Sequence, residues 1–220
     1  MSLKSAFDSC KSTPFSFSVF AVTSAGCISL ILALSSPFWL ESKPESESNF
    51  VSLGLWKVCF RDFQNPSIKY DDVFDGCYYF YGHKSENIPN WLQPGWFIFV
   101  QCLTTGSLIL AVISIGILVF MHFRNGVEVK IFASATVFVF EASSALISFL
   151  AVAIFGAMCF ERSWIQYPQY NSLSIGYIFA VVGALFLGLG TCLLLFQTFK
   201  LRKLLYRNIA VRYHVPHLDT

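Results

Sequence analysis

The sequence predicts an all-α membrane protein of four transmembrane helices with a small extracellular antiparallel β-sheet. Apolar residues make up 55% of the chain and charged residues only 13%, a composition that belongs to membrane proteins and excludes an ordinary soluble domain. Residues 12–40, 87–123 and 163–199 contain no Asp, Glu, Lys or Arg, and the apolar stretch 131–160 is interrupted only by Glu141. These four segments are the predicted membrane spans.

Each apolar segment has the length of a transmembrane helix, because about 20 helical residues cross the hydrocarbon core. Backbone polar groups in lipid must be paired within the segment, which favours helices over strands. The first segment follows Lys4 and Lys11, a pattern that a cleaved signal peptide would also show. Its apolar run is longer than that of a signal peptide, which favours a retained anchor. We expect helices at about 15–37, 96–121, 131–158 and 174–198.

The distribution of Lys and Arg predicts which side of the membrane each loop occupies. The segments 1–14, 122–130 and 199–220 together carry nine Lys and Arg, whereas the much longer 38–95 loop carries five and the 159–173 loop carries one. Positive charge gathers on the cytoplasmic side of a membrane protein. We therefore expect both termini and the tail 199–220 in the cytoplasm, and the loops 38–95 and 159–173 outside the cell.

Two of the seven cysteines, Cys59 and Cys77, lie in the first extracellular loop. An oxidising compartment lets disulfides form and persist, so these two are expected to bridge. The others are expected to be unpaired thiols or small buried hydrophobic groups, and a juxtamembrane Cys10 is a weak candidate for palmitoylation. They are Cys10, Cys27, Cys102, Cys159 and Cys192.

The first loop also contains strand-like sequence. The stretches "FVSLGLWKVCF" (50–60) and "CYYFY" (77–81) are rich in β-branched and aromatic residues, and "DFQNPSIKYDD" (62–72) between them is typical of a loop. A free hairpin is only marginally stable in water, and a disulfide adds about 2–4 kcal/mol. The sequence therefore predicts a small stapled sheet.

Trp39 and Trp56 are predicted to supply packing for this sheet. Gly54 within a strand indicates a bulge or a close backbone approach. Trp91 and Trp96 lie just before and at the start of the second helix and are interpreted as interfacial belt aromatics.

Trp39, "GLW" at 54–56, Cys59 and Cys77, in the first loop of a four-helix protein, resemble the signature of the claudin superfamily. That superfamily includes claudins, peripheral myelin proteins and the gamma subunits of calcium channels and AMPA receptors. "SSPFW" and "LQPGWFIFVQ" look most like insect claudin-like proteins of septate junctions. The resemblance implies one domain over residues 1–220, a left-handed four-transmembrane-helix bundle beneath an extracellular sheet to which both loops contribute. It also implies that Trp39, Gly54, Leu55 and Trp56 anchor the sheet and that Cys59–Cys77 is its disulfide.

Two features depart from vertebrate claudins. Seventeen residues separate Cys59 from Cys77, more than is usual there, and the chain ends in "HLDT" instead of Tyr-Val. Both features argue against a vertebrate tight-junction role and leave an invertebrate junction role standing.

The resemblance implies a multi-pass plasma-membrane protein at lateral cell–cell junctions, contributing to assembly of occluding or septate junctions and to the paracellular barrier. Its partners would be the lipid bilayer and other junctional membrane proteins in cis, with trans contacts left open, in a homo- or hetero-oligomer. The alternative is an auxiliary subunit or trafficking partner of an ion channel or receptor. The sequence has no phosphate-binding loop, metalloprotease motif or convincing nucleophile–base pair. We therefore predict no enzyme activity, catalytic residue, cofactor, metal or nucleic-acid partner.

Three further features have competing interpretations. Glu141 is a candidate intramembrane polar site, and we favour a side chain that is protonated or hydrogen-bonded to Ser or Thr residues of the bundle, such as the nearby Ser143 and Ser144. The small residues of "GALFLGLG" (183–190) suit helix packing in the bundle, and lateral assembly stays open. The 38–95 loop carries eight acidic and five basic residues, which form a solvated surface or attract cations to a paracellular path.

Overall fold

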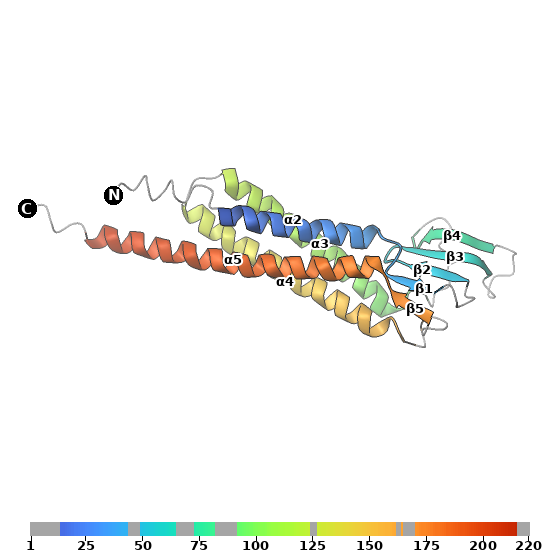
Figure 1. Ribbon diagram of the computed structural model, residues 1–220. Coiled ribbons are helices and arrows are strands. Elements are labelled where there is room, and N and C mark those ends of the chain that lie inside the picture. The colour runs from blue at the N-terminus through green and yellow to red at the C-terminus, as the bar shows by residue number, and fades with distance from the viewer. Residues whose placement is uncertain are drawn as a thin grey trace, which may run out of the picture.

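The computed structural model describes residues 14–43, 49–64, 73–81, 92–123, 127–161, 164 and 170–214 of the 220-residue chain. Within these ranges the chain forms a bundle of long helices with a sheet at one end (Figure 1). The start of the first helix and the end of the last helix lie at the other end. We refer to these as the sheet end and the terminal end of the bundle.

Four described helices are long and apolar enough to cross a membrane. This confirms the predicted fold class. Proline and serine mark several of their ends. α2 stops two residues before Pro37, α3 begins immediately after Pro94, and the carbonyl of Ser174 accepts the first backbone hydrogen bonds of α5. The helices are α2 (Pro14–Ser35), α3 (Gly95–Phe123), α4 (Val127–Met158) and α5 (Ile175–His214).

Two of the helices extend past the expected spans. α5 continues from the expected end at residue 198 to His214, so residues 199–214 of the expected tail are helical. α4 begins at Val127 instead of residue 131. Charged residues mark where a chain leaves the hydrocarbon core, but Lys, Arg and Leu are strong helix formers. The helix therefore does not have to end where the membrane ends.

The helices bury one face each, with buried positions alternately three and four residues apart. α2 packs against α5, α3 against α4, and α4 against α5. This seven-residue repeat is the packing seam of helices that supercoil left-handedly. Along α4 it comprises Ser134, Val137, Glu141, Ser144, Ser148, Ala151 and Phe155.

The described strands form one antiparallel sheet in the order β4-β3-β2-β1-β5. β5 comes from the connection between α4 and α5, so both loops contribute to the sheet. The first and last strands of this order, β4 and β5, lie at its edges. The strands are β1 (Leu40–Ser42), β2 (Phe50–Leu53), β3 (Lys57–Gln64), β4 (Val73–Tyr79) and β5 (Asn171–Leu173).

The predicted strand positions were correct only in part. The expected run 50–60 is divided by a turn into β2 and β3, and β3 continues to Gln64, inside the segment expected to be a loop. The second strand begins at Val73, four residues before the expected start at Cys77. The difference arises because the cross-strand pairing of Phe63 with Phe74 and Gln64 with Val73 extends the ladder beyond the disulfide.

The largest hydrophobic core lies where the sheet meets the bundle. It joins buried residues of the sheet to residues of α2, α3, α4 and α5. Leu40 and Leu53 are directly paired on the sheet and fully buried. Two smaller clusters lie farther along the helices. The sheet is therefore packed onto the bundle as part of the same core.

Candidate functional site

Trp39 closes the end of the first transmembrane helix. Its side chain is fully buried, and its indole Nε1–H donates a hydrogen bond to the carbonyl of Ala33 at 2.7 Å. In a continuing helix this carbonyl would accept from the residue four positions on, which is Pro37 and has no N–H. The indole therefore pairs a helix-terminal carbonyl that the backbone leaves without a donor.

The same residue joins three other elements. Its backbone N–H donates to Leu53 at 2.8 Å, and its carbonyl accepts from Ser174 N–H at 3.0 Å, which connects β2 and the start of α5. The ring packs edge-on against Phe155 of α4, with 4.9 Å between ring centroids, and against Tyr177 of α5 at 6.0 Å. Trp39 thus fixes the sheet to α2, α4 and α5 at one point.

Gly54 forms the turn between β2 and β3 and lies against the linker that follows α2. Its N–H donates to the carbonyl of Lys57 at 2.8 Å. A Cβ atom here would overlap the carbonyl oxygen of Ser36 and stand 2.7 Å from Pro37 Cα. Because both obstacles are backbone atoms, this approach is open only to glycine. Of the two interpretations of Gly54, the structure shows the close backbone approach.

Leu55 and Trp56 complete this turn and contact different partners. Leu55 is fully buried, and its carbonyl accepts a hydrogen bond from Nε2 of Gln101, a buried residue of α3. Trp56 is only half-buried, its carbonyl accepts from Phe80 N–H at 3.2 Å, and its ring lies 6.1 Å from that of Tyr81. Leu55 therefore faces the bundle, whereas Trp56 packs within the sheet.

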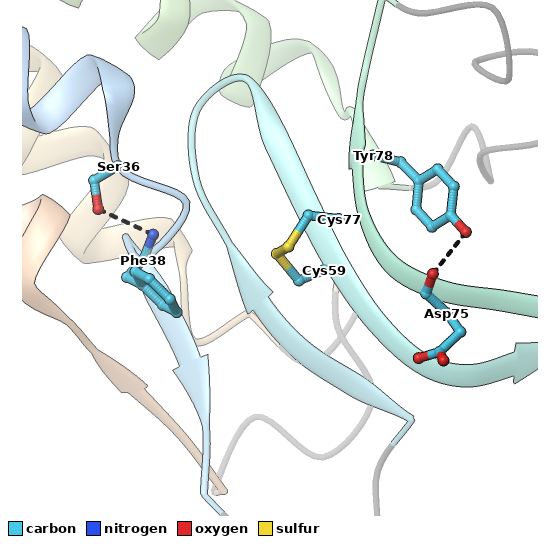
Figure 2. The surroundings of a disulfide bond; sticks show 6 residues. All are labelled: Ser36, Phe38, Cys59, Asp75, Cys77 and Tyr78. Carbon is cyan, nitrogen blue, oxygen red and sulfur yellow. Dashed lines mark hydrogen bonds between the residues drawn. A yellow bond between two sulfur atoms is a disulfide. The ribbon is translucent and has the colours of Figure 1, made fainter.

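Cys59 and Cys77 form a disulfide between directly paired positions of β3 and β4 (Figure 2). Cys59 is buried and Cys77 is exposed, so the bond lies at the sheet surface. Nearby, the Tyr78 hydroxyl donates to the carbonyl of Asp75 at 2.9 Å within β4 (Figure 2). The disulfide predicted for the first loop is present.

Trp96 is not simply an interfacial aromatic, and that prediction is wrong. Its ring packs edge-on against Trp164, with 4.5 Å between centroids, and against Phe155 at 6.2 Å. Trp164 in turn donates from its indole to the carbonyl of Leu92 at 3.1 Å. Trp96 is therefore partly buried and packs against the core that supports the sheet. Trp91 lies outside the described residues.

Glu141 is fully buried in α4 and is hydrogen-bonded across the bundle. The partner is Thr23 of α2, at 2.7 Å between Thr23 Oγ1 and Glu141 Oε1. The expected hydrogen bond to a bundle Ser or Thr is therefore present, but the partner is not one of the nearby serines named as examples. Ser144 instead pairs with Ser107 of α3 through two hydroxyl-to-carbonyl hydrogen bonds.

Two of the three glycines in the 183–190 stretch of α5 pack closely inside the bundle. A Cβ on Gly183 would lie 3.0 Å from Leu30 of α2, and one on Gly190 would overlap the carboxyl of Glu141. Gly188 has nothing within 4 Å of its Cβ position. The first two glycines therefore serve packing of α5 against α2 and α4.

Four free cysteines occur in the described part of the chain. Cys27 and Cys159 are buried, and Cys102 and Cys192 are exposed on the helices; Cys10 lies outside the described residues. Burial raises the pKa of the Cys159 thiol to about 11, so this thiol stays protonated and is a poor nucleophile at neutral pH. Among the residues that the structure describes, no three His, Cys, Asp or Glu come together as a metal site.

The family comparison identifies the fold. Residues 24–196 match the family model described as PMP-22/EMP/MP20/Claudin tight junction. The match includes all four apolar helices in whole or in part, the five strands and the residues Trp39, Gly54, Leu55, Cys59 and Cys77. No individual curated protein matched the chain. With this match over most of its length, the chain belongs to the claudin superfamily of membrane proteins.

Proposed function

We propose that this protein works in the plasma membrane at the lateral contacts of epithelial cells. There it contributes to assembly of an occluding or septate junction and to the paracellular barrier. The family match, whose description refers to the tight junction, supports a junctional role. In this proposal neighbouring copies or related membrane proteins associate in cis, and the sheet faces the intercellular space.

The position of the sheet relative to the basic residues supports this orientation. Lys200, Arg202 and Lys203 are exposed on α5 at the terminal end of the bundle, opposite the sheet (Figure 1). Positive charge just beyond a span favours the cytoplasmic side. A disulfide in the sheet suits the oxidising exterior. Both observations favour an extracellular sheet and cytoplasmic termini.

The observation on which the proposal depends is an edge strand with exposed aromatic side chains on a firmly held sheet. Val73, Tyr79 and Tyr81, on and just after edge strand β4, are 45%, 57% and 67% exposed. The ammonium group of Lys57 lies 4.5 Å from the centroid of the Tyr79 ring. Aromatic residues such as tyrosine are enriched at protein interfaces.

Anchoring makes such an edge useful for assembly. Trp39 and Leu55 hold the sheet to four helices through hydrogen bonds and packing. Each copy in a membrane therefore presents the edge in the same orientation. Weak contacts that repeat in a fixed geometry add up through multivalency and seal a line of molecules cooperatively.

The alternative function, an auxiliary subunit or trafficking partner of a channel or receptor, uses the same features. A sheet edge fixed above the membrane is also suited to a single larger partner in cis. The two functions differ in what fails when the protein is removed. Only the junctional role predicts that the paracellular space then becomes leaky.

The experiment is depletion in a polarised epithelium, followed by rescue. We expect depletion to admit a small inert dye and to disperse other junction proteins, and the wild-type chain to restore both. Tyr79→Ser should reach the surface but fail to restore the barrier. Tyr206→Ser, at a position 74% exposed on α5 at the terminal end, is the matched control and should rescue. A depleted epithelium that excludes dye while a channel current changes would support the auxiliary role instead.

A further inference from the structure

Glu141 lies deep in the membrane with no basic residue to neutralise it. It is twelve residues from the start and seventeen from the end of the Val129–Met158 span, or about 18 Å and about 26 Å along the helix axis at 1.5 Å per residue. The membrane-spanning parts of α2, α3 and α5 contain no Lys or Arg before Lys200. An ionised carboxylate here would be an uncompensated charge.

The hydrogen bonds around Thr23 indicate where a proton lies. Thr23 Oγ1 is 2.7 Å from Glu141 Oε1 and 2.9 Å from the carbonyl oxygen of Val19. A threonine hydroxyl has one hydrogen to donate and two lone pairs to accept. If Glu141 were ionised, both neighbours would be acceptors and would compete for this one hydrogen.

A protonated Glu141 satisfies both contacts at once. The carboxyl O–H then donates to Thr23 Oγ1, and the Thr23 hydroxyl donates to Val19, the usual bond of a helical threonine to the carbonyl four residues back. Glu141 Oε2 has no hydrogen-bond partner among the described residues. As the carbonyl oxygen of a neutral acid it is less costly to leave unpaired than as half of a carboxylate.

A third helix packs over this hydrogen bond. A Cβ on Gly190 of α5 would overlap Glu141 Oε1 and would stand 3.3 Å from Thr23 Oγ1. A larger residue at 190 would therefore push the carboxyl out of this position. The contact joins α2, α4 and α5 at one level of the bundle, and the absence of a side chain at 190 is part of the site.

We propose that Glu141 is a proton-binding site inside the bundle, where its neutral carboxyl donates to Thr23 and links α4 to α2 beneath Gly190. The titratable group that faces it from α2 is the thiol of Cys27. The described parts of α3 and α5 present no acidic or basic side chain within the membrane, and Cys102 and Cys192 are exposed on those helices. This proposal is independent of the junctional function.

Infrared spectroscopy of the full-length protein in lipid vesicles tests the protonation directly. At neutral pH we expect the carbonyl stretch of a protonated carboxyl in the wild type and its loss in Glu141→Gln. Thr23→Val should shift this band, because the carboxyl loses its acceptor. A wild type that differs from Glu141→Gln only in the carboxylate bands would overturn the proposal, and so would a band that Thr23→Val does not move.

Two glycine variants provide a matched pair that leaves Glu141 in place. Gly190→Ala should shift the acid band because the methyl group displaces the carboxyl, whereas Gly188→Ala, with open space around its Cβ position, should not. Equal spectra for the two variants would contradict the packing part of the proposal. This comparison does not depend on whether Glu141→Gln folds.

A hydrophobic carbodiimide gives a chemical test on the wild type. The acid proton moves to one carbodiimide nitrogen while the carboxyl oxygen bonds to the central carbon, and acyl transfer to nitrogen then leaves a stable N-acylurea. Peptide mapping should find this adduct on Glu141 at neutral pH, with loss of labelling as the pH rises. Absence of the adduct from vesicles in which the reagent labels a known protonated membrane carboxyl would count against the proposal.

Discussion

Replacing Trp39 with phenylalanine tests the hydrogen bond that caps α2 separately from the aromatic packing of the same side chain. Phenylalanine keeps an aromatic ring against Phe155 and Tyr177 but removes the N–H that pairs the Ala33 carbonyl. A buried polar group left without its partner costs about 1–3 kcal/mol, and the smaller ring leaves a cavity that costs about 1 kcal/mol. We therefore expect Trp39→Phe to lower the free energy of unfolding by about 2–4 kcal/mol.

The assay is thermal unfolding of the purified full-length protein in one detergent, followed by circular dichroism. For a chain of this size each kcal/mol shifts the midpoint by about 2–4 °C, so the expected loss is about 4–16 °C. Trp56→Phe is the control, because this tryptophan is half-buried, and it should cost less than about 1 kcal/mol. Equal midpoints for the two variants would refute the assignment of Trp39 as the cap of α2.

Three further predictions follow from the sheet and its supports. Gly54→Ala should destabilise the protein by about 1–3 kcal/mol, because the new Cβ meets backbone atoms, whereas Gly106→Ala, with nothing within 4 Å, should not; the same thermal assay compares them. Cys59→Ser should cost about 2–4 kcal/mol and make Cys77 reactive toward a maleimide, while normal folding and surface delivery would show that the bridge is dispensable. An epitope inserted at 44–48 should be labelled on intact cells and one at either terminus should not, with labelling of a terminal tag reversing the proposed orientation.

The helices were predictable because their signal is local. A run of membrane length that is free of charge, or in one case interrupted only by Glu141, defines each span by itself, which is why the fold class was correct. The end of α5 was not predictable in this way, since the basic residues that follow the span also favour helix. β1 has only three residues, Leu40–Ser42, and becomes a strand because β2 and β5 pair with it on both sides. Such a strand has no sequence pattern of its own.

The candidate site was predictable in its residues but not in its contacts. Trp39, Gly54 and the cysteines were recognised by type and order, whereas the reason for each depends on atoms distant in sequence. Glu141 shows this most clearly, because a bundle Ser or Thr partner was expected, but Thr23 is 118 residues away in the sequence and no local pattern singles it out. Trp96 was misassigned for the same reason, since an aromatic residue near the membrane surface has the same sequence signature whether it faces lipid or packs in a core.

The length of α5 has a mechanical consequence. Its 40 residues measure about 60 Å at 1.5 Å per residue, roughly twice the thickness of the hydrocarbon core. At the sheet end, Gly176 N–H bonds to the carbonyl of Phe38 and Ser174 bonds to both Trp39 and Glu41. The helix is therefore tied to the sheet at one end and extends well beyond the thickness of the hydrocarbon core. If α5 tilted as a rigid rod about its sheet end, a tilt of about 5° would displace the end near His214 by about 5 Å over that length.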